Sequence, residues 1–200
     1  MYFDSSEFYH VYNRGNNRQI IFFSDRNYLF FLKKIREQIF PVADILAYCL
    51  MPNHFHFILK PNENGLTERI SFGGKPMQEL SYRLGILLSS YAQAINKQNR
   101  TTGSLFQQKT KAKILVEKDN GIRISYLEKC FHYIHLNPVM AGLAKNPEDW
   151  AYSSYPDYIG LRNGTLCCRE LFYSNTGLNA DDIRLRVEEG LDEKTLEKLF

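Results

Sequence analysis

The stretch Asp44–Leu59, DILAYCLMPNHFHFIL, contains two apolar and aromatic runs on either side of a turn. The runs Asp44 to Leu50 and His54 to Leu59 have the length and composition of strands, and Met51-Pro52-Asn53 carries residues that favour a tight turn. Lys60-Pro61 ends the second run, because proline cannot donate to a sheet ladder. The stretch therefore predicts two consecutive strands.

The flanking sequence extends this pair in both directions. An aromatic strand at Phe8–Tyr12 comes first, followed by a helix that Ser24 or Asp25 can cap and that ends at Pro41. After the pair we expect a loop at 62–75 and a helix from Pro76 to about Ile95. A basic strand region at Gly103–Val116 follows, and then another helix at Asp119–Asn137. The order β-α-β-β-α-β, then α, resembles the ferredoxin-like or RRM-like plan, an α+β fold with an antiparallel sheet and two helices on one face.

The chain is long enough for one large domain. We expect residues 1–145 to form that domain and residues 146–200 to form an appendage that is turn-rich and then helical, with short helices in Ala180–Phe200. A hydrophobic content of 44% and a charged content of 24% are ordinary for a globular chain.

Several sequence patterns are absent, and their absence limits where we expect the protein to act and which chemistry we expect it to perform. No apolar run approaches the roughly 18 residues of a membrane span, no secretory signal is visible, and the four cysteines lack zinc-like spacing. We therefore expect a cytoplasmic protein with no membrane partner. The sequence also lacks GxGxxG, a P-loop, Gly-x-Ser-x-Gly and His-Glu-x-x-His.

The formal net charge of +3 averages two unlike parts. Residues 1–115 carry 15 Lys and Arg against 8 Asp and Glu, a net +7, whereas residues 116–200 carry 10 against 14, a net −4. An acid-free stretch between Glu79 and Glu117 holds Arg83, Lys97, Arg100, Lys109, Lys111 and Lys113. The asymmetry indicates a polyanion-binding surface, although a solvated helix face with an ordinary edge strand would give the same pattern.

His54 and His56 share one side of their strand because strand side chains alternate. Phe55, Phe57 and Leu59 take the other side, which we expect to be buried under helices. Two neutral imidazoles so close together suit one divalent metal ion, but chance pairs of this kind also occur on half-exposed strands.

The helix expected to end at Asn137 carries a second candidate group. Tyr133 and Asn137 lie one turn apart on one flank of its apolar stripe, and His132 and His135 fall on the opposite flank. Pro138 disfavours helical geometry at the preceding residue and so places the pair in the last turn. An amphipathic tyrosine at the edge of a core would give the same spacing.

Four segments, in this order, resemble the single-tyrosine HUH transposases, in particular the REP-associated tyrosine transposases and their insertion-sequence (IS200-like) relatives. They are YHVYNRGNNRQ (Tyr9–Gln19), MPNHFHF (Met51–Phe57), GSLFQ (Gly103–Gln107) and YIHLNPVMAGL (Tyr133–Leu143), followed by Trp150 and Ser153-Ser154-Tyr155. The resemblance covers about residues 8–158 and makes residues 1–145 the catalytic domain, with the Tyr133 helix as an added catalytic helix.

The resemblance implies a metal-dependent endonuclease and strand transferase that acts on single-stranded DNA through a 5′-phosphotyrosine. It implies Tyr133 as the nucleophile and His54, His56 and Asn137 as metal ligands, with Asn137 where some relatives have Gln. The implied cofactor is Mg²⁺ or Mn²⁺, although nitrogen ligands also suit Zn²⁺ and Ni²⁺. The sequence names no proton acceptor for the tyrosine, since His135 lies on the wrong flank.

The implied partner is single-stranded DNA, as a hairpin with a flanking guide sequence, bound on the nucleoid. We expect a set of basic side chains to contact the DNA: Arg14, Arg18, Lys109, Lys111 and Lys113. Lys97 and Arg100 are weaker candidates. Tyr12 and Phe106 are candidates to stack on bases, or are core aromatics. A monomer with its site in cis is expected, and a homodimer is the alternative.

Two other functions fit the same residues. A non-catalytic nucleic-acid-binding module on an RRM-like sheet would bind in a salt-dependent way without a metal requirement. A HUH replication initiator or relaxase would share the histidine pair and the tyrosine, and inverted repeats or a plasmid origin beside the gene would distinguish it.

Overall fold

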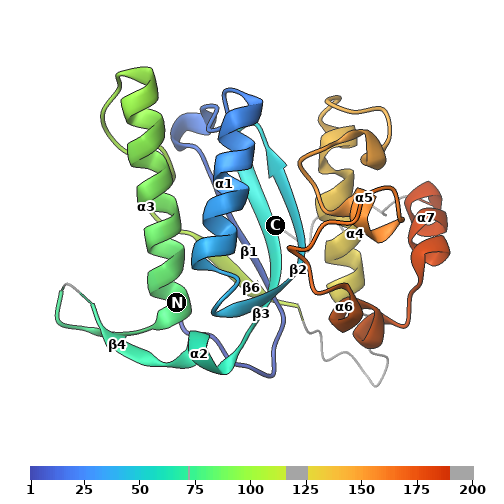
Figure 1. Cartoon of the computed structure of the whole chain (residues 1–200), viewed down its shortest axis with the longest axis horizontal. Helices are drawn as coiled ribbons and strands as arrows, with labels where there is room; N and C mark the ends of the chain where they lie inside the picture. The colour runs from blue at the N-terminus through green and yellow to red at the C-terminus, as the bar shows by residue number, and fades with distance from the viewer. Residues whose placement is uncertain (72, 116–125, 190–200) are drawn as a thin grey trace.

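A computed structural model of the chain describes residues 1–71, 73–115 and 126–189. Its central sheet has four strands, β1 (Tyr9–Arg14), β2 (Ala43–Met51), β3 (His54–Pro61) and β6 (Lys111–Ile114), in the order β2-β3-β1-β6 (Figure 1). Each strand is antiparallel to its neighbours. The predicted α+β fold with a β-α-β-β-α-β core is therefore confirmed.

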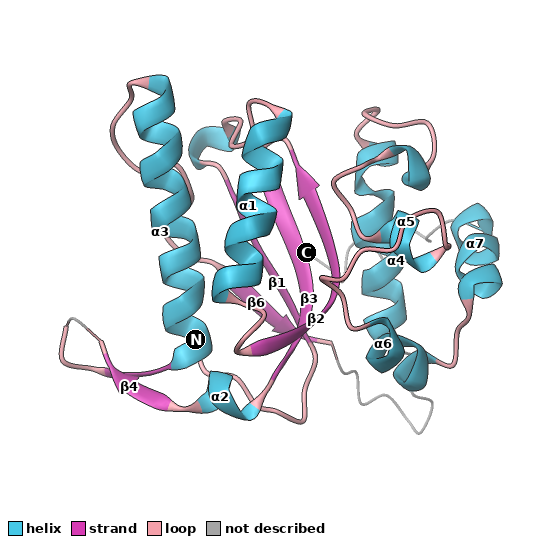
Figure 2. Ribbon diagram, viewed as in Figure 1, coloured by secondary structure: helices cyan, strands magenta, loops and turns pink. Residues whose placement is uncertain are grey.

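One face of the sheet is covered by the helices α1 (Asp25–Gln38) and α3 (Glu79–Asn99) (Figure 2). Phe55 and Phe57 of β3 point to this face and are at most 1% exposed. They pack with Phe31 of α1 and, through it, with Tyr91 of α3. The expectation that the phenylalanine side of the strand is buried is confirmed.

The opposite face of the sheet is covered in part by α4 (Tyr126–Met140). A second core forms where Cys49, Met51 and Ile58 of the sheet meet Phe131 and Ile134 of this helix. The helices α5 (Tyr155–Tyr158), α6 (Arg169–Thr176) and α7 (Ala180–Glu189) gather around α4 beyond the β2 edge (Figure 1). The side of the sheet that holds the histidines is thus a partly covered surface.

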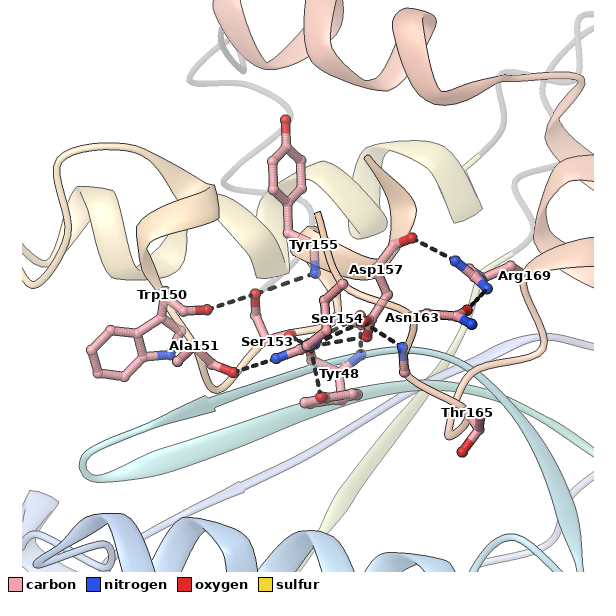
Figure 3. Close-up of polar contacts among 12 residues, drawn as sticks. Tyr48, Trp150, Ala151, Ser153, Ser154, Tyr155, Asp157, Asn163, Thr165 and Arg169 are labelled. Carbon is pink, nitrogen blue, oxygen red and sulfur yellow. Dashed lines mark hydrogen bonds and ion pairs between the residues drawn. The ribbon is translucent and has the colours of Figure 1, made fainter. Parts of the chain in front are cut away.

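The segment after α4 is hydrogen-bonded along the edge of β2 (Figure 3). The Leu50 amide donates to the Tyr152 carbonyl at 2.9 Å, and the Ser154 amide donates to the Tyr48 carbonyl at 2.9 Å. An ion pair between the buried Asp157 and the half-buried Arg162, 2.7 Å long, holds the following loop. These contacts cover the sheet edge, and the predicted division of the chain at residue 145 stays a prediction.

The loop predicted at 62–75 is wrong in part. It contains a short helix, α2 (Glu63–Leu66), and a strand, β4 (Glu68–Ile70), that pairs with β5 (Pro76–Gln78). Pro76 therefore begins the second strand of a small hairpin rather than a helix, and α3 begins at Glu79. The ion pair of Arg69 with Glu79, at 2.9 Å, joins the hairpin to the helix, a non-local contact that the local pattern does not reveal.

The strand predicted at Gly103–Val116 is shorter than expected. Regular pairing is confined to β6, and Phe106 adds only an isolated bridge to Gly15. A 3-10 helix, η1 (Asn16–Arg18), follows β1, and a second, η2 (Pro147–Asp149), follows α4. Residues 116–125, where the start of the last predicted helix falls, and the end of the tail, 190–200, lie outside the described residues.

Proline does not end the helix at Asn137 as predicted. α4 runs through Pro138 to Met140, and the Ala141 amide still donates to the Asn137 carbonyl at 2.9 Å. Gly142, two residues beyond the end of the helix, has a φ of 67° that suits glycine. Within the described residues, no helix is both long and apolar enough to cross a membrane.

Candidate functional site

A cavity of about 430 Å³ opens where β1, β3 and β6 meet α4. Its lining residues are Tyr12, Asn13, Arg14, His54, His56, Gln107, Lys109, Lys111, Tyr133 and Asn137. The structure thus brings together all four residues predicted to carry the chemistry and three of the five predicted to contact DNA. Arg18 and Lys113 lie outside this lining.

The pairing of β1 with β3 places the histidines. Arg14 is opposite His54 and Tyr12 is opposite His56, so alternate residues of both strands share the face that α4 partly covers. The two imidazole rings of β3 are perpendicular, with centroids 4.9 Å apart. Strand alternation therefore delivers both rings to one side, as the sequence predicts.

His54 is held by the turn that precedes it. Its Nδ1 lies 2.6 Å from the Asn53 amide oxygen, and the Asn53 nitrogen donates to the Arg18 carbonyl at 3.3 Å. An amide oxygen only accepts, so Nδ1 carries the proton and Nε2 keeps its lone pair. Burial, together with the charge of Arg14, lowers the pKa of His54 to about 4. The ring is therefore neutral at physiological pH.

His56 is 2% exposed and lies against a third histidine, His10 of β1. Its Nδ1 is 2.8 Å from His10 Nε2, and its own Nε2 has no hydrogen-bond partner among the described residues. Burial and the neighbouring histidines hold the pKa of His56 well below the ordinary value of 6.5. His56 Nε2 is therefore a buried polar atom left unsatisfied by the described residues at the wall of a cavity, where a ligand could supply the missing partner.

Tyr133 and Asn137 lie one turn apart on α4 and both line the cavity. Asn137 Nδ2 donates to the Tyr133 carbonyl at 2.9 Å, which leaves its amide oxygen on the side of His54. The Tyr133 ring meets the His56 ring edge-on, with centroids 5.7 Å apart. Burial raises the pKa of the Tyr133 hydroxyl above its usual value of 10, and a separate side-chain hydrogen bond between Asn137 and that hydroxyl opposes the shift.

The donor set of the cavity fits a divalent cation. Two neutral imidazoles and one amide oxygen face the same space, and His56 Nε2 is otherwise unsatisfied among the described residues. No group of three or more His, Cys, Asp or Glu residues able to hold a metal ion occurs in the described part of the chain. The remaining coordination positions would therefore be open to water and substrate oxygens.

The predicted DNA-contacting residues occupy three different environments. Lys109 and Lys111 are exposed at the cavity wall, and Lys111 Nζ lies 5.7 Å from the centre of the Tyr12 ring. Arg18 borders an adjoining hollow of about 540 Å³ that shares Arg14 and His54 with the cavity. Lys113 is half-buried, and its charge adds to burial, the larger cause, in lowering the pKa of His10. Only the first two environments border the cavity or the adjoining hollow.

Two other residues that the sequence singled out lie away from the cavity. Phe106 is 5% exposed and packs against Phe55 in the apolar core, so it is not placed to stack on a base. His135 is fully buried, with Nε2 at 2.8 Å from Ser154 Oγ, which agrees with the expectation that it points away from Tyr133.

His10, Asn13 and Gln107 are site residues that the sequence argument missed. Asn13 Nδ2 donates to the Gln107 carbonyl at 3.1 Å and to Thr110 at 3.0 Å, which ties β1 to the loop before β6. His10 precedes Tyr12 by two positions, and this spacing is a signal that both share one strand face. The register that sets His10 beside His56 could not be read from the sequence.

Among solved structures, the chain is similar to a REP-associated tyrosine transposase bound to a REP hairpin. The TM-score is 0.56 at 16% sequence identity, over 80% of this chain and 83% of that one. The similarity confirms the predicted resemblance at the level of the fold. No protein-family model and no curated protein matches the sequence.

Proposed function

We propose that this protein is a metal-dependent, single-stranded DNA endonuclease and strand transferase, a transposase whose nucleophile is Tyr133. The observation that carries the proposal is the convergence of His54, His56 and Tyr133 on one cavity lined by Arg14, Lys109 and Lys111. These groups come from three strands or loops and a helix far apart in the sequence, and they combine ligand nitrogens, a hydroxyl and cations at one place.

Tyr133 would attack the scissile phosphate through its phenolic oxygen. A bond forms between that oxygen and phosphorus, and the bond from phosphorus to the 3′ oxygen of the departing strand breaks. The products are a 5′-phosphotyrosine and a free 3′-OH, so the proton that the phenol loses is balanced by the one that the 3′ oxygen gains. A second 3′-OH can reverse the step and join two strands.

The neutral state of the histidines supports their role as ligands, because only a deprotonated ring nitrogen can bind a cation. When bound, Mg²⁺ or Mn²⁺ supplies a Lewis acid that neutralises charge on the reacting phosphate. His54, His56 and the Asn137 oxygen would hold that ion. Burial disfavours the Tyr133 phenolate, so the phenol needs this cationic surrounding to lose its proton.

The substrate is expected to be a DNA hairpin with a single-stranded flank. The solved structure with a similar fold holds a REP hairpin, and this chain has cations at the cavity and in the adjoining hollow. The basic groups would contact phosphates, and Tyr12 offers an aromatic face at the cavity wall for a base.

The test is a covalent-adduct assay on a labelled hairpin with a single-stranded flank, in Mn²⁺, resolved by denaturing electrophoresis. Wild type should retain the labelled strand, EDTA should abolish the adduct, and Tyr133→Phe should give none. Tyr12→Phe is the matched control, because Tyr12 is the other tyrosine of the cavity lining, and it should still form the adduct. Equal cleavage by Tyr133→Phe and wild type would refute the assigned nucleophile.

The same assay separates the alternatives. A non-catalytic binding module would shift the hairpin in native gels, with a dependence on salt, but would form no adduct and would bind equally in EDTA. A replication initiator or relaxase would form the adduct on a plasmid-origin strand rather than on the hairpin. Sedimentation of the free protein would test the expected monomer against a homodimer.

A further inference from the structure

His10 forms a contact with His56 that the proposed chemistry does not yet use. The two residues sit diagonally across β1 and β3, their ring planes are 24° apart, and the centroids are 5.0 Å apart. His10 is 1% exposed and does not line the cavity. It therefore contacts the ring behind the cavity wall, on the side away from any substrate.

A hydrogen bond between two neutral imidazoles has two solutions, because one nitrogen must donate and the other accept. If His10 Nε2 donates, His56 carries its own proton on Nε2 and cannot ligate through that atom. If His56 Nδ1 donates, Nε2 keeps a lone pair for a ligand. The 2.8 Å contact between His56 Nδ1 and His10 Nε2 is compatible with both arrangements.

Satisfaction of buried groups favours the second arrangement once a cation is bound. Neither His10 Nδ1 nor His56 Nε2 has a hydrogen-bond partner among the described residues. In the first arrangement both atoms stay unsatisfied, and the His56 proton would face the ion. In the second, the cation satisfies His56 Nε2 and only one buried nitrogen remains without a partner.

The neighbouring ligand uses the same device. His54 Nδ1 donates to the Asn53 oxygen at 2.6 Å, which fixes its proton on Nδ1 and leaves a lone pair on Nε2. Metal-bound histidines commonly donate their second ring N–H to a fixed acceptor, which sets both tautomer and orientation. His10 is held for such a role, because its ring stacks on Tyr12 with centroids 4.6 Å apart.

We propose that His10 is a positioning residue that accepts the hydrogen bond from His56 Nδ1–H and thereby presents His56 Nε2 to the divalent cation. This inference rests on the proposed function for the identity of the ligand. Its content is separate, since it assigns a tautomer and a supporting partner that can be measured without DNA cleavage.

The experiment compares wild type, His10→Phe and His10→Gln by calorimetric titration with Mn²⁺ and by imidazole ¹⁵N NMR with Mg²⁺. His10→Phe keeps a ring and removes the acceptor, and it should weaken Mn²⁺ binding about 10- to 100-fold. His10→Gln keeps an acceptor oxygen and should recover part of the loss. His56→Ala defines complete loss of the site, and the spectrum should place the wild-type His56 proton on Nδ1.

His132→Phe is the matched control, because His132 is 3% exposed, lies outside the cavity lining, and has no hydrogen bond at either ring nitrogen among the described residues. It should bind Mn²⁺ as wild type does. Wild-type affinity in His10→Phe, or a His56 proton on Nε2, would overturn the inference. If wild type itself bound no Mn²⁺, the proposed function would fail. The tautomer of His56 in the metal-free protein would still decide the role of His10. A proton on His56 Nδ1 supports that role, and a proton on His56 Nε2 overturns it.

Discussion

The two faces of the central sheet are built from the same strands but have different chemistry. Phe55 and Phe57 of β3 face α1 and α3 in an apolar core, whereas His54 and His56 face α4 and the cavity. Phenylalanine rings of β3 pack on the first side, and neutral imidazoles gather on the second. Because strand side chains alternate, a single strand supplies stability on one face and reactive groups on the other.

The largest expected effect is a loss of folding stability at low pH, caused by the buried histidines on the α4 side of the sheet. All five histidines have a pKa below the ordinary 6.5, because burial disfavours the charged form: about 3 for His10 and His135, about 4 for His54 and His132, and well below 6.5 for His56. Between the folded and unfolded pKa values the unfolded chain binds more protons. Stability is therefore lost as the pH falls below 6.5, by about 1.4 kcal/mol per pH unit for each buried histidine.

Denaturant unfolding between pH 7.5 and 5 measures this loss. His132→Phe removes one titrating group without touching the cavity, so it should reduce the slope of stability against pH by about 1.4 kcal/mol per unit. A free energy of unfolding that stays constant over this range would show that the histidines titrate normally. The side of the sheet that carries His54 and His56 would then be more open to water than the burial of these side chains indicates.

The next effect belongs to the apolar face. Phe55→Ala removes a ring that is fully buried, and it should lower the free energy of unfolding by about 3–5 kcal/mol through lost burial and a residual cavity. It should shift the curve of stability against pH downward without changing its shape. Chemical denaturation at pH 7.5 gives the value.

His54→Ala, the adjacent position on β3, is the matched comparison. His54 is half-buried beside an open cavity, so its removal should cost less than about 1.5 kcal/mol while lowering Mn²⁺ affinity. Similar losses of stability for the two variants would contradict the claim that one face of the sheet supplies stability and the other supplies reactive groups.

A smaller effect concerns the contact that anchors α4 to the β2 edge. Ser154 Oγ lies 2.9 Å from the Tyr48 amide and 2.8 Å from His135 Nε2, and all three groups are buried. Ser154→Ala leaves two buried polar groups without this partner and should cost about 1–3 kcal/mol. Thermal unfolding compares it with Ser174→Ala, an exposed serine of α6 that should have no measurable effect.

The smallest expected effect is on DNA binding, and it distinguishes a lysine at the cavity from a lysine on the other side of the sheet. Lys111→Gln should weaken binding of a single-stranded oligonucleotide and lower the slope of log affinity against log salt by about 0.7, the value for one phosphate contact. Lys97→Gln changes an exposed lysine of α3, on the apolar side of the sheet, and should leave the slope unchanged. Fluorescence anisotropy over a salt series measures both, and equal slopes would place the DNA elsewhere.

Much of this division could be predicted from the sequence, because it depends on short-range periodicity. Alternation along 54–59 separates imidazoles from phenyl rings, and the spacing of Tyr133 and Asn137 places both on one side of a helix. Their arrival at a common cavity is not a local property, and it was expected only from the resemblance.

Three features could not be predicted because they depend on pairing between distant segments. The register of β1 against β3 sets His10 behind His56, and a shift of one residue would have turned it to the other face. The hairpin of β4 with β5 is made of three-residue strands, too short for a periodic signal. The pairing of 152–154 with the β2 edge joins segments about a hundred residues apart.

The most direct test of the central claim locates the covalent bond. Trypsin would release Tyr133 in the peptide from Cys130 to Lys145, in which it is the only tyrosine, whereas Tyr12 falls in the peptide that ends at Arg14. After reaction with a hairpin in Mn²⁺ and nuclease trimming, mass spectrometry should find the nucleotide mass on the first peptide alone. A nucleotide on the Tyr12 peptide, or no adduct on any peptide in the presence of cleaved DNA, would contradict the account.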